Sequence, residues 1–261
     1  MGKAIVITSG KGGVGKTTTT ANLGTALSFL GKKTVVVDAD IGLRNLDLIM
    51  GLEGRIVYTF MDVLNGDCNL GQALIRDRRA KNLHLLPTSQ HHNKDDIRPE
   101  QMKRICLALK SEYDYVLIDS PAGIEQGFQN AVVGADEALV ITTPDVAAVR
   151  DADRVIGLLE NMEVETQLIV NRLFIEMVNA HDMLDHQDVV SILATKLLGV
   201  IPEDPEKIIV SSNRGLPLTY NPYSLAGPAY RRIARRITGD TISIPEFKSE
   251  RWFSRLLGKL L

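Results

Sequence analysis

The sequence predicts an α/β fold with a doubly wound, mostly parallel sheet, and three observations lead to that prediction. Seven short apolar runs recur along the chain, and their apolar residues are nearly continuous, as in strands buried on both faces. Segments with helical periodicity separate these runs, which is the order of βαβ units. A glycine-rich stretch, GKGGVGKT, joins the first apolar run to the first helical segment, as in a P-loop NTPase fold.

The predicted strands share this continuous apolar character and are Ala4–Thr8, Thr34–Asp38, Leu83–Pro87, Asp114–Asp119, Ala138–Thr143, Gln167–Asn171 and Leu197–Ile201. Helical periodicity marks four of the segments between and after them, Thr17–Gly31, Arg98–Glu112, Asp145–Met162 and Ser224–Gly239. Helices are therefore expected on both faces of the sheet. In such folds ligands bind at the carboxyl ends of the strands.

The composition is that of a globular protein. With 261 residues, 44% hydrophobic and 24% charged, the chain fits one large domain better than two small ones. The net charge of −2 argues against a wholly basic nucleic-acid binder, although local basic patches stay open. Cys68 and Cys106 lack the C-x-x-C spacing of a structural zinc site, so buried thiols in a reducing compartment are expected.

No targeting or spanning segment is predicted. The N-terminal apolar run is too short for a signal peptide, and no run reaches the roughly 18 apolar residues of a bilayer span. Residues 1–240 form the predicted main domain, and 241–249, which contain Pro245, form a linker to a final helix at 250–261. The polar segment 89–99 gathers four potential metal ligands, but adjacent histidines point in different directions, so a solvated loop is expected. These ligands are His91, His92, Asp95 and Asp96.

The glycine-rich stretch predicts a nucleotide site. Gly10–Thr17 matches G-x-x-x-x-G-K-[ST] directly after a strand and before a helix, which is the context that this motif requires. Backbone N–H groups and the helix N-terminus would surround phosphates, Lys16 would neutralise them, and Thr17 would offer its hydroxyl to Mg²⁺. ATP and Mg²⁺ are therefore the expected ligands. The predicted nucleotide-binding residues here are Gly10, Lys11, Gly12, Gly13, Val14, Gly15, Lys16, Thr17 and Thr18.

Carboxylates at two strand ends complete this predicted site. VVVDADIG supplies Asp38 and Asp40, and VLIDSPAG supplies Asp119. A lone aspartate at a strand end is usually a turn cap, but two such strand ends after a phosphate loop favour a Mg²⁺-linked site.

KGGVGKTT, DADIGLRNLD and IDSPAG together resemble the deviant Walker A ATPases, the ParA/MinD group, from Lys3 to about Gly239. The resemblance implies an ATPase in which Lys11 reaches across a dimer interface to the partner's ATP. It further implies that Asp40 orients the attacking water while Thr17, Asp38 and Asp119 support Mg²⁺.

The same resemblance implies that the ends of two later strands frame the adenine. The residues concerned are Asn171 and Arg172 in VNR and Pro202 in IPED. The alternative for these positions is ordinary turn chemistry.

The last residues form a predicted amphipathic helix of the kind that lies in a membrane interface. Its apolar stripe is Trp252, Phe253, Leu256, Leu257, Leu260 and Leu261. Basic residues lie on the other side or its borders, facing anionic lipid in this interpretation, namely Lys248, Arg251, Arg255 and Lys259. A helix docked on the protein's own core is the competing interpretation.

With this tail, the chain looks most like the septum-site-determining branch of the group. That resemblance implies an ATP-dependent homodimer, cytoplasmic and peripheral on the inner face of the plasma membrane or the corresponding organelle face. It also implies a MinC-like division inhibitor and a MinE-like activator as partners. Arg44 and the helix Asp145–Met162, including Asp151 and Asp153, are the candidate contacts. The rivals are a DNA-partitioning ATPase, which the basic run Tyr230–Ile237 could serve, and a flagellar-number ATPase. An iron–sulfur reductase is disfavoured, because DSPAGIEQGFQNAVVGAD lacks a ligating cysteine.

Overall fold

The structure is a computed structural model that describes residues 1–42, 44–89 and 97–247. The amphipathic tail predicted at 250–261, Lys248, and the four potential metal ligands between 91 and 96 lie outside the described residues. Within them no group of three or more histidine, cysteine, aspartate or glutamate side chains could hold a metal ion.

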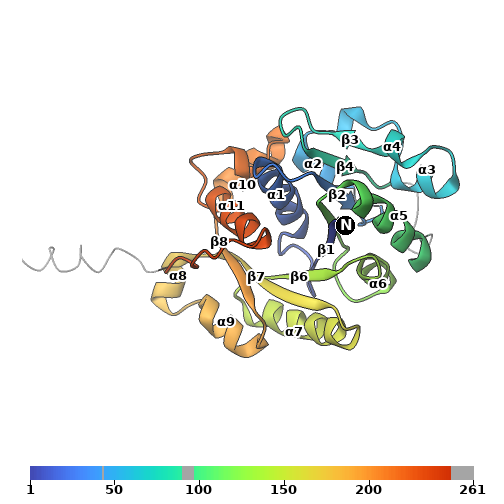
Figure 1. The fold of residues 1–261 in the computed structure, drawn as a ribbon. Helices are drawn as coiled ribbons and strands as arrows, with labels where there is room; N and C mark the ends of the chain where they lie inside the picture. The colour runs from blue at the N-terminus through green and yellow to red at the C-terminus, as the bar shows by residue number, and fades with distance from the viewer. Residues whose placement is uncertain (43, 90–96, 248–261) are drawn as a thin grey trace, which may run out of the picture.

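An eight-stranded sheet runs through the described chain, in the order β3-β4-β2-β5-β1-β6-β7-β8 (Figure 1). The strands are β1 (Lys3–Thr8), β2 (Thr34–Asp38), β3 (Ile75–Arg76), β4 (Leu83–Leu86), β5 (Tyr115–Asp119), β6 (Glu137–Thr142), β7 (Glu165–Leu173) and β8 (Leu197–Pro202). All neighbours are parallel except β3, which pairs antiparallel with β4 at the edge. The predicted doubly wound, mostly parallel sheet is confirmed.

Helices follow nearly every strand, as βαβ order requires. They are α1 (Lys16–Phe29), α2 (Leu46–Met50), α3 (Phe60–Asn65), α4 (Leu70–Ala73), α5 (Pro99–Glu112), α6 (Gln126–Val132), α7 (Val146–Asn161), α8 (Ile175–Ala180), α9 (His186–Leu193), α10 (Pro205–Arg214) and α11 (Ala226–Ile237), with short 3₁₀ turns η1 (Glu53–Arg55) and η3 (Leu218–Tyr220). The four predicted helical segments correspond to α1, α5, α7 and α11.

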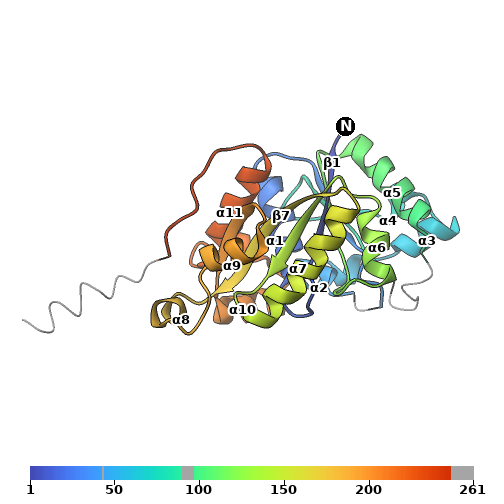
Figure 2. The ribbon, with the colours of Figure 1, turned by 90° about the horizontal axis from the view of Figure 1, so that it is seen from below.

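Two hydrophobic cores lie on opposite faces of the sheet, because successive side chains of a strand point to opposite sides. In β1, Ala4 and Val6 belong to one core and Ile5 and Ile7 to the other. Helices α1 and α11 cover one face, and α7 and α9 cover the other under β6 and β7 (Figures 1 and 2). Every strand of the centre is therefore buried on both faces, which explains its continuous apolar sequence.

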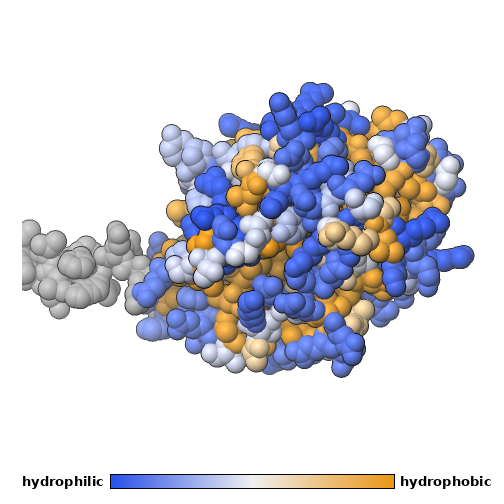
Figure 3. Space-filling view, in the orientation of Figure 1, coloured by the Kyte–Doolittle hydropathy of each residue, from blue (hydrophilic) through white to orange (hydrophobic). Residues whose placement is uncertain are grey.

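The surface that covers these cores is mixed. On the face shown in Figure 3, hydrophilic and hydrophobic residues are interspersed rather than sorted into one continuous band. Among the described residues, no helix combines the length and the apolar character needed to cross a bilayer. Both cysteines are free thiols, with Cys106 buried and Cys68 partly so.

The segment 241–247 contains no helix or strand, as expected of a linker, yet it is attached to the domain. The Arg236 guanidinium donates hydrogen bonds to the carbonyls of Ile242 (2.8 Å), Ser243 (2.7 Å) and Leu198 (3.0 Å). At its end, the Phe247 ring meets His186 edge-on at 5.8 Å between centroids. The chain therefore leaves the described domain beside α9.

Candidate active site

The loop between β1 and α1 has the conformation of a phosphate-binding loop. Gly13 and Gly15 have φ angles of 80° and 96°, in the left-handed region that side chains rarely adopt. Gly15 is the N-cap of α1, so the loop passes directly into a helix whose first N–H groups point back into it. The loop therefore presents backbone donors and the positive end of the helix dipole to an anion.

Neighbouring strands and helices hold this loop from behind. A Cβ on Gly10 would lie 2.1 Å from the carbonyl oxygen of Asp151, so the loop packs against the backbone of α7. The buried Asn171 side chain, near the end of β7, donates from Nδ2 to the Val14 carbonyl at 2.7 Å. Its Oδ1 accepts from the Arg172 backbone N–H. Asn171 therefore fixes the shape of the loop.

The phosphate-loop lysine lies inside the site. Lys16 is 7% exposed, and its Nζ donates to the Ser9 hydroxyl at 2.9 Å. That hydroxyl donates in turn to the Lys11 carbonyl at 2.7 Å. The ammonium group is thus held over the loop by a short polar chain, where it can neutralise phosphate oxygens.

Two buried carboxylates lie beside the loop at adjacent strand ends. Asp38 and Asp119 are paired in the register of β2 and β5 and are 2% and 1% exposed. Burial, and then the charge of Asp119, raises the pKa of Asp38 well above its ordinary value. Burial also raises the pKa of Asp119 to about 7, against the lowering effects of the Thr17 hydroxyl and the Lys16 charge.

This acid pair suits a hydrated Mg²⁺ ion. Asp38 Oδ2 is buried and accepts no hydrogen bond from the described residues, so the site has an unsatisfied anionic oxygen. Asp38 Oδ1 accepts a hydrogen bond from the Asp40 backbone N–H at 3.1 Å, and the Thr20 hydroxyl donates to Asp119 at 3.2 Å. Oxygen donors of this kind, together with the Thr17 hydroxyl, are the ligands that Mg²⁺ prefers.

A cavity of about 590 Å³ opens in front of the loop. Seven of the predicted site residues line it, and they are Gly12, Gly13, Gly15, Lys16, Thr17, Thr18 and Asp40. The cavity therefore joins a cationic phosphate site to a carboxylate at the carboxyl edge of the sheet, where α/β folds bind ligands. That arrangement can bind a polyphosphate and place a water molecule near Asp40.

Helices α2 and α10 form the remaining walls of this cavity, which sequence analysis did not predict. Asn45, Leu48 and Ile49 line it at α2, and Ser212 and Asn213 line it from α10, with Ala122 between strand and helix. Asn45 falls inside the DADIGLRNLD stretch that carries the family resemblance, so the sequence did contain a signal that could have placed Asn45 at the site. The SSN run of α10 has no motif that would have indicated a cavity wall.

Lys11 lies beside this cavity and not among its lining residues. Its Nζ is 3.7 Å from Asp145 Oδ1, and both side chains are about half exposed, at 47% and 48%. Burial opposes ionisation of Asp145, but hydrogen bonds from Thr143 and from the Ala148 N–H, with the Lys11 charge, keep its pKa below the ordinary value. Asp145 also caps α7, so Lys11 is held loosely at the start of that helix.

The predicted adenine residues lie near the ends of β7 and β8 but face different surroundings. Asn171 is used by the phosphate loop, and Pro202 is buried at the end of β8. Arg172 pairs with Glu203 at 3.0 Å and lines a separate cavity of about 340 Å³ with Thr143 and Phe174. Contact of these three residues with adenine stays a prediction.

Comparisons with known proteins agree with this geometry. A family model described as an AAA domain matches residues 2–172. A putative septum site-determining protein MinD from Guillardia theta is 57% identical over 95% of this chain and 93% of that protein.

Two solved structures share the fold over most of the chain. MinD in the MinC:MinD cell division complex of Aquifex aeolicus is 48% identical, with a TM-score of 0.88 over 95% of this chain and 100% of that one. MinD from Pyrococcus horikoshii, complexed with Mg-ADP, is 31% identical, with a TM-score of 0.82 over 92% and 97% of the two chains.

Proposed function

Because the chain belongs to the MinD family of septum site-determining ATPases, we propose that it is an ATP-driven membrane switch. In this proposal the protein binds ATP with Mg²⁺, dimerises, and attaches peripherally to the inner face of the plasma membrane or the corresponding organelle face. There it recruits a MinC-like division inhibitor, and a MinE-like activator stimulates hydrolysis. The main support is the cavity before the phosphate loop, combined with the second lysine, Lys11, at its rim.

The reaction is hydrolysis of ATP to ADP and phosphate. Backbone N–H groups of residues 12–18 and the Lys16 ammonium bind the phosphate oxygens, and Asp40 orients the attacking water. Thr17, Asp38 and Asp119 would hold Mg²⁺, which supplies positive charge to the developing phosphate oxygens. These groups act by position and charge, because phosphoryl transfer depends on both more than on covalent chemistry.

Lys11 supplies the dependence on dimerisation. Its ion pair with Asp145 is long and half exposed, so it costs little to break. Once released, the side chain is free to reach the nucleotide of a partner subunit. Hydrolysis would then be slow in the monomer and faster in the dimer, since a cation brought by the partner stabilises the transition state.

Membrane attachment is assigned to residues 250–261, which lie outside the described part of the chain. One short amphipathic helix with a few basic residues binds an anionic surface reversibly, at about 1 kcal/mol per basic residue. Two such helices on one dimer bind with an avidity about 10²- to 10⁴-fold higher. Nucleotide state would thereby control residence on the membrane.

Partner contacts are proposed on α7 and next to the phosphate loop. Asp151 of α7 touches the loop through its backbone, and the Asp153 side chain follows on the same helix. Arg44 has a φ of 47° and donates to Asp47 at 2.8 Å, so its position depends on the start of α2. A partner bound there would touch elements that also shape the nucleotide cavity.

The rival function in DNA partitioning loses its main support in α11. Three of the four arginines in Tyr230–Ile237 are engaged within the chain. Arg231 donates to the Thr219 carbonyl, Arg235 pairs with Asp240 at 2.6 Å, and Arg236 donates to three carbonyls. A DNA-binding patch needs guanidinium groups that are available to phosphates.

A vesicle sedimentation assay tests the proposal. Full-length protein is mixed with vesicles containing anionic lipid in the presence of Mg-ATP or Mg-ADP, and the pelleted fraction is measured. Binding is expected with ATP and is expected to be lost with ADP, in the Lys16→Ala variant, and in a chain that ends at Phe247. The Lys32→Ala change, at a partly exposed position away from the cavity, is the control and should bind as the unmodified protein does. Binding that does not need ATP or the tail would overturn the proposal.

A further inference from the structure

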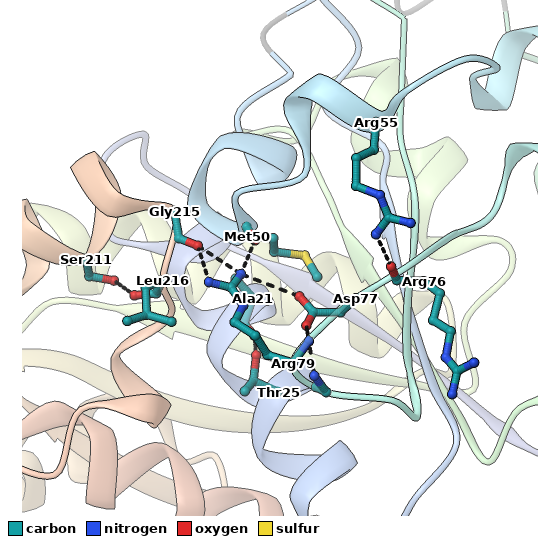
Figure 4. A network of polar contacts seen from close by, with 11 residues as sticks. Ala21, Thr25, Met50, Arg55, Arg76, Asp77, Arg79, Ser211, Gly215 and Leu216 are labelled. Carbon is teal, nitrogen blue, oxygen red and sulfur yellow. Dashed lines mark hydrogen bonds and ion pairs between the residues drawn. The ribbon is translucent and has the colours of Figure 1, made fainter.

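One arginine outside the nucleotide cavity joins the ends of two helices that form its walls. Arg79 lies in the turn between β3 and β4, and its side chain is about one third exposed. It donates to the Met50 carbonyl at 2.5 Å and, through both terminal nitrogens, to the Gly215 carbonyl at 3.0 Å (Figure 4). Met50 is the last residue of α2, and Gly215 is the C-cap of α10.

These two carbonyls are natural partners for a cation. The last carbonyls of a helix have no intrahelical donor and carry the negative end of the helix dipole. A planar guanidinium group presents several donors in a fixed fork, so one arginine can bind both helix ends at once. An ammonium group on a lysine has neither this geometry nor this reach.

The position of Arg79 is itself determined by its surroundings. Asp77 is almost fully buried, and its Oδ1 accepts the backbone N–H groups of Arg79 (2.6 Å) and Ala80 (2.8 Å). Its Oδ2 lies 3.6 Å from the guanidinium group. The Arg79 guanidinium also lies 5.4 Å from the centroid of the Tyr220 ring, which packs edge-on against Phe29 of α1.

At the same point the backbones of the two helix ends touch. A Cβ on Gly51 would lie 2.6 Å from the Gly215 carbonyl oxygen, and one on Gly215 would lie 2.4 Å from Gly51 Cα. Both glycines have positive φ angles, 64° and 55°. The Ser211 hydroxyl closes the end of α10 by donating to the Leu216 carbonyl at 2.6 Å (Figure 4). The contact is therefore a tight junction with no room for adjustment.

The other parts of these helices face the nucleotide cavity. Leu48 and Ile49 of α2 line one wall, and Ser212 and Asn213 of α10 line another. Each is within four residues of the junction, so a change at Arg79 is transmitted to the walls along one helical turn. Arg79 itself is not a lining residue.

We propose that Arg79 is a positioning residue of the nucleotide site, which sets the separation of its α2 and α10 walls without touching the nucleotide. The phosphate loop, by contrast, is held by Asn171 and α7 and does not depend on Arg79. Loss of Arg79 should therefore weaken binding of the part of the nucleotide that extends beyond the phosphates. Binding of phosphates alone should be kept. This inference rests on the proposed nucleotide site.

The test compares Mg-ADP with Mg-pyrophosphate by calorimetric titration of the purified full-length chain. For Arg79→Met, the dissociation constant of Mg-ADP is expected to rise about tenfold, the equivalent of one charge-assisted hydrogen bond, while that of Mg-pyrophosphate changes less than about twofold. Arg79→Lys should give an intermediate loss, because it keeps the charge but not the fork. If Arg79→Met does not fold, Arg79→Lys alone carries the comparison.

The matched control is Arg78→Met, which removes the same group from the neighbouring, exposed position. It should leave both dissociation constants unchanged. A purely structural role for Arg79 would lower the unfolding temperature of the free protein and leave the ratio of the two constants as it was, which would overturn the inference. An equal rise in the dissociation constants of Mg-ADP and Mg-pyrophosphate would overturn it too. If the unmodified protein failed to bind Mg-ADP, the proposed function would fail instead.

Discussion

Asp38 and Asp119 form a pair that is costly for the fold and useful only with a cation. Both carboxylates are buried at adjacent strand ends. Burial and the charge of Asp119 disfavour the ionised form of Asp38, whereas burial and the charge of Asp40 disfavour that of Asp119. A carboxyl group whose pKa is raised on folding opposes folding at pH values above its unfolded pKa. The nucleotide-free protein should therefore carry a local instability at this site.

The Asp38→Asn variant should consequently be more stable without ligand. At pH 8 its free energy of unfolding is expected to rise by about 1 kcal/mol or more, since one pKa unit corresponds to 1.36 kcal/mol. This gain in the free energy of unfolding should shrink as the pH falls toward 4. At low pH the Asp38 carboxyl group is increasingly protonated in the unfolded chain as well as in the folded one, so folding no longer has to neutralise it. Urea denaturation at several pH values measures this. The same variant should lose the Mg²⁺ dependence of ADP binding; a variant that is destabilised at pH 8 would contradict the argument.

Lys11 gives a second prediction at the level of single residues. Lys11→Ala homodimers should hydrolyse ATP at least about tenfold more slowly, because a partner's cation contributes strongly to phosphoryl transfer. Asp145→Asn is the matched control: it breaks the ion pair within the subunit but keeps the lysine, so hydrolysis should persist.

Mixing two inactive variants separates action within a subunit from action across the dimer. In a dimer of Lys11→Ala with Asp40→Ala, the site of the first subunit has its own Asp40 and the partner's Lys11. An equal mixture should therefore regain about a quarter of normal turnover, with half of the dimers mixed and one of two sites active in each. An inactive mixture would show that Lys11 serves its own subunit.

These residues were predictable because their chemistry is encoded locally. The phosphate loop has a contiguous motif, and Asp38 and Asp119 each end a predicted strand. Their pairing needs only the rule that parallel strands end at one edge. Asp145, Ser212 and Asn213 were not predicted as site residues, because their contacts depend on where α7 and α10 pack. Arg79 has no local signal at all, since its partners Met50 and Gly215 are distant in sequence.

Among the elements, the central strands were predicted to within two residues, whereas β3 was missed. Strands buried on both faces have a continuous apolar sequence, which identifies them without knowledge of their neighbours. By contrast, β3 contains only Ile75 and Arg76, with one side chain buried and one exposed. So short a segment is recognisable only through its pairing with β4. The shortest helices, such as α2 and α4, were also missed, because four or five residues are too few to show a helical period.

The segment 241–247 behaves as a docked part of the domain, and its attachment depends on Arg236 of α11. Ile244 and Phe247 pack against one hydrophobic core. Two carbonyls of the segment, those of Ile242 and Ser243, accept hydrogen bonds from the Arg236 guanidinium, which also donates to the Leu198 carbonyl of β8. Most of the predicted linker is therefore held in place, which shortens the free connection to the tail. A shorter free connection restricts where the tail can reach relative to the nucleotide site.

Arg236→Met should release this segment without unfolding the domain. The amide hydrogens of residues 241–247 should exchange at least about tenfold faster than in the unmodified protein, because local opening no longer breaks charge-assisted hydrogen bonds. Exchange in β1 and β5 should stay the same. Arg232→Met, one turn earlier on α11, is the control. Unchanged exchange in Arg236→Met would mean that the packing of Ile244 and Phe247 alone holds the segment.

For the whole molecule, the proposed function requires two segments at opposite ends of the chain to act together. In that proposal the phosphate loop at residues 10–17 would control dimerisation, and the tail at 250–261 would supply weak membrane affinity to each subunit. If avidity links them, a dimer with a single tail should bind a vesicle no better than a monomer does. This consequence distinguishes two mechanisms. In one, both tails of a dimer are needed for attachment; in the other, ATP binding exposes a tail that attaches on its own.

Titration with subunits that end at Phe247 tests the link directly. With Mg-ATP and a ninefold excess of the shortened chain, about nine tenths of full-length subunits share a dimer with a tail-less partner, so most should leave the vesicles. The same excess of a shortened chain carrying Lys16→Ala should leave binding unchanged, because that chain lacks the phosphate-loop lysine needed to dimerise with ATP. Tails that act singly would keep full-length subunits on the vesicles in both mixtures. The loss requires exchange of subunits between dimers, so the pelleted fraction is measured after that exchange has reached equilibrium.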